Sequence, residues 1–150
     1  MPQKLLNLSL VRRKEMHKAL KEREQQRAAF IELARSYIHK LGQVLPILCG
    51  VVCGSVARGD FNLGSDIDVL IISNSLPPHP LDRMDLLYRY VEVGLEPKGY
   101  TTDEFITMLN KGNPLALDAW QNGVVVQDDG WWQKLTQVVR QEDLNAGRQA

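Results

Sequence analysis

A long stretch without glycine or proline, from about Leu10 to Leu41, lies near the start of the chain and predicts one continuous helix. Its second half carries apolar residues at the three-and-four spacing of a buried helical stripe: Phe30, Ile31, Ala34, Tyr37, Ile38 and Leu41. Its first half, Arg12 to Arg27, is mostly charged or glutamine, so we expect it to project from the domain or to meet another chain. So long a helix followed by short strands argues against a Rossmann sheet.

The rest of the chain alternates short apolar runs with helical segments, which is typical of an α/β (α+β) domain. We expect strands within 46–53, 65–72, 95–100 and 124–126, and helices over 81–93, 101–112, 114–121 and 131–142. Thr101 and Glu104 have the spacing of a capping box at the start of one helix. We therefore divide the chain into an N-terminal helical extension (1–41), a domain with a small mixed sheet flanked by helices (42–144) and a disordered tail (145–150).

The net charge, the cysteines and the hydropathy of the chain exclude several classes of protein. The formal net charge is zero, so no overall basic field indicates a protein that grips long nucleic acids. Cys49 and Cys53 are four residues apart on a predicted strand, roughly 13 Å, which is too far for a disulfide. With no signal segment and no apolar run near the ~18 residues of a membrane span, we expect a reduced, cytoplasmic protein.

The segment that follows the first strand has the chemistry of an anion site. Gly54 lets the main chain approach a bulky anion, and the hydroxyl of Ser55 adds a donor. Where a strand runs into a helical turn, unpaired backbone N–H groups point at the ligand. An ordinary turn is the alternative interpretation, because Gly-Ser alone is common at strand ends.

Two aspartates mark the start of the second strand. Asp66 and Asp68 point to the same face of a strand, with Cα atoms roughly 6.5 Å apart. A close pair of acids is costly beside apolar residues unless a cation joins them, and carboxylate oxygens suit Mg²⁺. The alternative is a solvated strand end that carries two unrelated acids.

Together these segments, Gly54-Ser55…Arg58-Gly59…Ser65-Asp66-Ile-Asp68, resemble the motif of the polymerase-β-like nucleotidyltransferase superfamily, and more narrowly the minimal nucleotidyltransferases. The resemblance implies that superfamily's fold. It implies that Gly54, Ser55, Arg58 and Ser65 bind the nucleotide. For Arg58 an ion pair with Asp60 or Asp66 is the alternative, and for Ser65 a cap of the turn before the strand.

The same resemblance implies a third acid, commonly an aspartate shortly before a Tyr-Thr-x-x-Glu helix start. Tyr100 to Glu104 match that helix start, and Glu96 falls at the position of the acid. Glu92 is the competing candidate. The implied catalytic and metal-binding set is Asp66, Asp68 and Glu96.

The activity that the resemblance implies is transfer of a nucleoside monophosphate, AMP from ATP, to an acceptor hydroxyl with release of pyrophosphate, with two Mg²⁺ ions as cofactors. Minimal enzymes of this kind are often encoded beside a HEPN protein, commonly an RNase toxin, and serve as its antitoxin. A HEPN partner is therefore expected, with the N-terminal helix as one contact or as a surface for homo-oligomers. An antitoxin that acts by contact alone and an antibiotic-modifying transferase are the alternatives, and nucleic acid is a less favoured partner.

Overall fold

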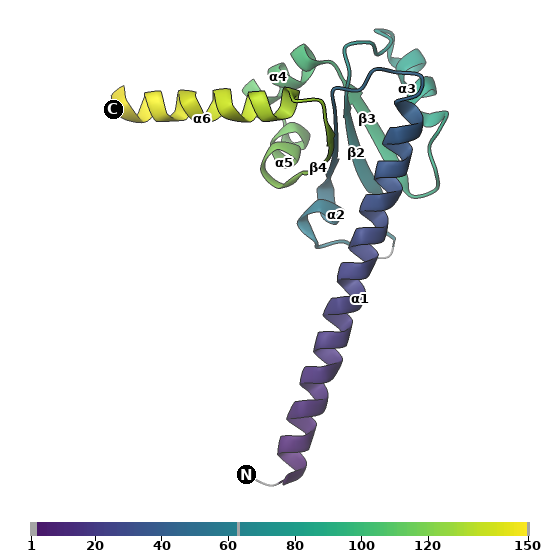
Figure 1. The fold of residues 1–150 in the computed structure, drawn as a ribbon, viewed down its shortest axis with the longest axis vertical. Coiled ribbons are helices and arrows are strands. Elements are labelled where there is room, and N and C mark those ends of the chain that lie inside the picture. The colour runs from purple at the N-terminus through teal and green to yellow at the C-terminus, as the bar shows by residue number, and fades with distance from the viewer. Residues whose placement is uncertain (1–2, 63, 150) are drawn as a thin grey trace.

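Four short strands form a mixed sheet in the computed structural model, which describes residues 3–62 and 64–149 (Figure 1). Strand β1 (Cys49–Cys53) pairs antiparallel with β2 (Ile67–Ile72) and with β4 (Val124–Asp128). Strand β2 pairs in parallel with β3 (Leu95–Tyr100). The order is β3-β2-β1-β4, so β3 lies at an edge. The small mixed sheet predicted from the sequence is confirmed.

Helix α1 (Gln3–Leu41) runs away from the domain along most of its length (Figure 1). It begins before the predicted Leu10, because the preceding residues contain no helix breaker. The predicted stripe packs on the domain: Ala34, Tyr37, Ile38 and Leu41 are at most 1% exposed. The outer turns lie in solvent, where large apolar residues such as Leu8 and Met16 are 55% and 66% exposed.

Two arginines in the half of α1 that we expected to project are instead bonded to the domain. Arg23 donates to the carbonyl oxygens of Gly59 (2.8 Å) and Phe61. Arg27 donates to the carbonyl oxygens of Val56 (2.9 Å) and Ala57 (2.8 Å). The projecting part of α1 therefore ends before Arg23, and the helix holds the segment that follows β1.

The sheet separates two apolar clusters, so strand β2 is buried on both faces. On one face Ile67, Val69 and Ile71 pack with α1 residues such as Tyr37 and Ile38. On the other face Leu70 and Ile72 pack with residues of the later helices: Phe105, Ala116, Ala119 and Trp132. The three tryptophans belong to this second cluster, with ring centroids 5.2 Å apart for Trp120 and Trp132. They therefore serve core packing.

The remaining helices connect the strands and cover the sheet. They are α2 (Gly54–Arg58), α3 (Pro80–Tyr88), α4 (Thr102–Asn110), α5 (Pro114–Asn122) and α6 (Trp131–Gln149). The capping box at α4 is confirmed: the Thr101 side chain accepts from the N–H of Glu104 (3.2 Å), and the Glu104 carboxylate accepts from the N–H of Thr101 (3.4 Å).

Two boundaries differ from the prediction. Helix α3 ends at Tyr88 and not near Val93, and Gly94, with φ +95°, precedes β3. Helix α6 runs to Gln149, whereas we predicted a disordered tail from Asn145; the segment holds neither proline nor a strong breaker cluster, so helical hydrogen bonding continues. Ala150, the last residue of that tail, lies outside the described residues.

Both cysteines are buried free thiols, at opposite ends of β1, which confirms that they form no disulfide with each other. Among the described helices, none combines the length and the apolar character that crossing a bilayer requires.

Candidate active site

The residues predicted to bind the nucleotide and the metal all line one hollow of about 550 Å³, here called the acidic hollow. Its lining residues are Gly54, Ser55, Arg58, Ser65, Asp66, Asp68, Glu96, Pro114, Leu115 and Asp118. They come from the end of β1, from α2, from β2 and β3, and from the start of α5. The predicted anion site and the predicted acids therefore face a common space.

The register of the sheet brings the acids together. Asp68 lies beside Cys53 on β1 and beside Glu96 on β3, and Asp66 directly precedes β2. Glu92, the alternative third acid, instead accepts a hydrogen bond from Lys40 on α1 (2.8 Å) and does not line the hollow. The geometry therefore places Glu96, and not Glu92, next to the aspartates.

The backbone of Gly54 lies close to the carboxylate of Asp68. Its φ is +74°, a conformation that glycine adopts without strain. A Cβ atom at this position would lie 2.3 Å from Oδ2 of Asp68. Glycine is therefore required here both by the backbone and by the neighbouring carboxylate.

Crowding of negative charge characterises the hollow. Burial raises the pKa of Asp68, the carboxylates of Glu96 and Asp66 raise it further, and Lys98 works in the opposite direction. The Nζ of Lys98 lies 3.8 Å from Oε1 of Glu96. A cation among these carboxylates would relieve their repulsion.

The donor set fits Mg²⁺. Within the part of the chain that the structure describes, no three His, Cys, Asp or Glu side chains are arranged to hold a metal ion by themselves. Mg²⁺ in nucleotide sites typically takes only one or two carboxylates and completes its shell with water and phosphate oxygens. Asp66 and Asp68 supply that kind of incomplete set, facing a space large enough for a polyphosphate.

Asp118 is a member of the site that the sequence did not reveal. Its Oδ2 accepts a hydrogen bond from the N–H of Gly54 (2.8 Å), and its Oδ1 accepts one from Nη1 of Arg58 (2.9 Å) and one from Asn122 (3.1 Å). Burial opposes ionisation, but these three hydrogen bonds together lower the pKa of Asp118. It lies on α5, far along the chain from the motif, and no local pattern marks it.

Arg58 and Ser65 both make contacts within the protein. Arg58 pairs with Asp118 and with Asp60 (3.3 Å), so Asp60 was correctly named as a partner and Asp66 was not. The Oγ of Ser65 accepts from the N–H of Asn62 (3.0 Å), which is the turn-capping role considered for it. Both residues still line the acidic hollow.

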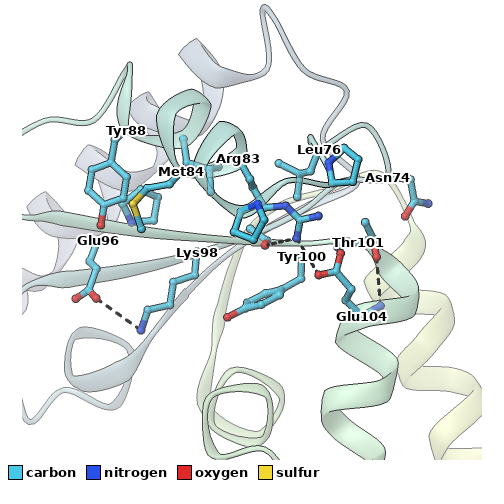
Figure 2. A pocket seen from close by; sticks show the side chains of 15 residues that line it. Asn74, Leu76, Arg83, Met84, Tyr88, Glu96, Lys98, Tyr100, Thr101 and Glu104 are labelled. Carbon is cyan, nitrogen blue, oxygen red and sulfur yellow. Dashed lines mark hydrogen bonds and ion pairs between the residues drawn. The ribbon is translucent and has the colours of Figure 1, made fainter.

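A second hollow of about 710 Å³, here called the α3–β3 groove, meets the first at Glu96 (Figure 2). Leu76, Met84, Leu87 and Pro97 give it apolar walls. In Figure 2, Met84 and Tyr88 project from α3 above the strand, while Glu96 and Lys98 extend below it. At the other end Arg83 donates to Glu104 (2.8 Å). The groove therefore combines an apolar centre with charged pairs at its ends.

Comparison with known proteins agrees with this geometry. The family model described as a nucleotidyltransferase domain matches residues 40–140, more than half of the chain. The chain belongs to the nucleotidyltransferase domain family. This confirms the resemblance found in the motif, and the domain is one for nucleotidyl transfer.

Solved structures of similar fold are distant in sequence. The crystal structure of a "putative nucleotidyltransferase" from Sulfolobus solfataricus has 18% identity and a TM-score of 0.55, covering 73% of this chain and 89% of that one. A crystal structure of a toxin-antitoxin with AMP-PNP has 15% identity and a TM-score of 0.49, covering 77% of this chain and 92% of that one. No curated protein matches by sequence. At such identity the first structure shows the fold alone.

Proposed function

We propose that this domain transfers AMP from ATP to a hydroxyl group on a partner protein. The observation that carries the proposal is that Gly54, Ser55 and Arg58 line the same hollow as the carboxylates of Asp66, Asp68 and Glu96. A polyphosphate needs donors on one side and a cation on the other, and this hollow offers donors together with carboxylates that would hold the cation.

Each group of residues has a distinct part in the reaction. Gly54, Ser55 and Arg58 would bind the triphosphate and fix its orientation, and Asp66 and Asp68, with Glu96 at a second position, would hold Mg²⁺. When bound, the two Mg²⁺ ions stabilise negative charge on the attacking and leaving oxygens. The acceptor oxygen forms a bond to the α-phosphorus, the bond from that phosphorus to the bridging oxygen breaks, and pyrophosphate leaves.

Glu96 has the position of a group that acts on the acceptor. It lies on the side of Asp68 away from β1, where the acidic hollow meets the α3–β3 groove. Its carboxylate would take the proton that the acceptor hydroxyl loses. An acceptor that enters along the groove would reach the phosphate past this residue.

The charges of the groove favour a protein acceptor over a polycationic antibiotic. The acids that line it are each paired with a cation: Glu96 with Lys98, and Glu104 with Arg83. A polycation requires unpaired negative charge, whereas the apolar centre suits side chains of a polypeptide. The resemblance to minimal nucleotidyltransferases makes a HEPN toxin the partner that we propose.

The strand edge in the groove is unsuited to pairing with an added strand. The carbonyl of Gly99 on β3 faces outward and accepts from Arg83 (3.3 Å), while that of Tyr100 faces inward and accepts from Ser73 (3.0 Å). By this alternation Pro97 also faces outward, where it has no N–H to donate. A partner would therefore bind the groove through side chains.

An antitoxin that acts by contact alone is the second candidate. The observation in its favour is the contact of Glu96 with Lys98, which gives the third acid a cationic neighbour without any metal. Transfer of label separates the two, because contact alone leaves the partner unmodified.

The test uses ATP labelled at the α-phosphate, Mg²⁺ and the protein encoded beside this one. We expect label on the partner with the wild-type chain, and a loss of at least about 100-fold with Asp66→Asn, whose neutral amide is a poor ligand for the cation. The exposed Asp129, which does not line the hollow, provides the matched control Asp129→Asn. Tight complex formation without label would support the contact antitoxin, and an active Asp66→Asn variant would refute the role of that residue.

A further inference from the structure

The donors that we assign to the triphosphate already hold an anion of the protein's own. The N–H of Gly54 lies 2.8 Å from Oδ2 of Asp118, and Nη1 of Arg58 lies 2.9 Å from Oδ1. One carboxylate thus joins both groups, using a different oxygen for each. Its side chain is only 21% exposed, so these are not loose surface contacts.

A carboxylate and a phosphate make the same demand on such donors. Both are anions that accept charge-assisted hydrogen bonds through oxygens about 2.7–2.9 Å from nitrogen. A donor N–H such as that of Gly54 can give one strong hydrogen bond at a time. Asp118 and a phosphate of the substrate therefore compete for the N–H of Gly54, while Asp118 also offsets the positive charge of Arg58 that would attract the phosphate.

From this we infer that Asp118 competes with a substrate phosphate for these donors and thereby lowers the affinity of the protein for triphosphate. The inference rests on the proposed function, because it takes Gly54 and Arg58 as the phosphate donors. It adds to that function a residue of the nucleotide site that sets affinity and that must give up its hydrogen bond from Gly54 when that N–H binds a phosphate.

The surroundings of Asp118 favour an ionised competitor. The hydrogen bonds from Gly54, Asn122 and Arg58 lower its pKa against the effect of burial, so the carboxylate is charged at neutral pH. Asp60 is a useful contrast. It also pairs with Arg58, at 3.3 Å, but its side chain is 64% exposed and it does not line the acidic hollow.

The experiment measures binding of inorganic tripolyphosphate and of a non-hydrolysable ATP analogue by calorimetry, without any acceptor. We expect Asp118→Asn and Asp118→Ala to lower Kd by about 10-fold relative to the wild type, because a neutral side chain competes less for the donors. Asp60→Asn removes the same charge from Arg58 without freeing Gly54, and we expect it to change Kd by less than about 2-fold. Thermal unfolding of each variant checks that the fold is retained.

Repeating the Kd measurements with EDTA tests whether each effect depends on Mg²⁺. Competition for Gly54 and Arg58 needs no metal, so the tighter binding of Asp118→Asn should persist with EDTA, whereas an effect of Asp66→Asn should require Mg²⁺. An unchanged or higher Kd in both Asp118 variants would overturn the inference, as would an equal gain in Asp60→Asn. If the wild type binds and the variants bind equally well, the proposed function survives alone; if none of the proteins binds tripolyphosphate or the ATP analogue, both fail.

Discussion

The acidic hollow and the α3–β3 groove meet at Glu96 but are built in different ways. The acidic hollow is lined by charged and small residues, most of them between Gly54 and Asp68. The groove is larger and mostly apolar at its centre, and it is assembled from α3, the loop before it and β3. Most of the acidic hollow thus comes from one short continuous segment, while the groove is assembled from residues between Asn74 and Glu104.

The residue shared by both hollows offers the sharpest test of this comparison. We expect Glu96→Gln to reduce transfer by about 100-fold or more, because general-base and metal-binding carboxylates contribute on that scale. Binding of ATP, measured by calorimetry, should change little. Glu92→Gln is the matched control, since Glu92 pairs with Lys40 outside the hollow. A larger loss in Glu92→Gln would reverse the assignment of the third acid.

Within the acidic hollow, Gly54→Ala tests the close approach of backbone to carboxylate. A positive φ costs alanine about 1–2 kcal/mol, and the new Cβ would also displace the carboxylate of Asp68. We expect a loss of roughly 2–3 kcal/mol in urea unfolding together with loss of ATP binding. Gly112→Ala has a similar φ (+71°) and no described atom within 4 Å of its Cβ, so it should show the backbone cost alone. Equal losses in both variants would mean that the contact with Asp68 is unimportant.

Within the groove, Met84→Asp tests whether the acceptor lies there. Met84 lines the groove and is 58% exposed. An aspartate there should therefore leave the fold intact but weaken an apolar contact with the acceptor protein. We expect kcat/KM for the partner protein to fall about 10-fold while ATP binding is unchanged. Leu81→Asp, on the same helix but outside the groove and 70% exposed, is the control. Identical effects of the two changes would remove the groove from the acceptor path.

The smallest effect is expected at the far end of the groove. The hydrogen bond from Arg83 is the main reason why the pKa of Glu104 is lowered, so the folded state favours the carboxylate. The ionised Glu104 therefore adds to the free energy of unfolding at pH values above its ordinary pKa of about 4.3. This stabilisation is lost as the pH falls through the lower pKa of the folded state.

We expect Glu104→Gln to cost about 0.5–1 kcal/mol in urea unfolding at pH 7, a modest value because the side chain is 41% exposed. The difference from the wild type should shrink as the unfolding is repeated at progressively more acidic pH. A difference that stays constant down to pH 3 would show that charge is not its cause.

Most residues that line the acidic hollow could be picked out from the sequence, because their pattern is local. The Gly-Ser turn and the two acids stand on consecutive strands, and family resemblance supplied Glu96. The sequence did not identify Asp118 as a site residue, because its contacts depend on where α5 packs. A single aspartate in a helix has no distinguishing pattern. The α3–β3 groove was not predicted from the sequence for a different reason. Helix α3 carries the apolar side chains of Leu81, Met84 and Tyr88, but these are 43–70% exposed, and periodicity does not tell what covers such a face.

Helix α1 is joined directly to the segment that carries Arg58. It is a continuous rod of 39 residues, roughly 58 Å at 1.5 Å per residue, anchored where Arg23 and Arg27 bind carbonyl oxygens of the segment from Val56 to Phe61. That segment carries Arg58. A molecule that pulls or tilts the outer turns of α1 would thus act, over a long arm, on the guanidinium that Asp118 holds.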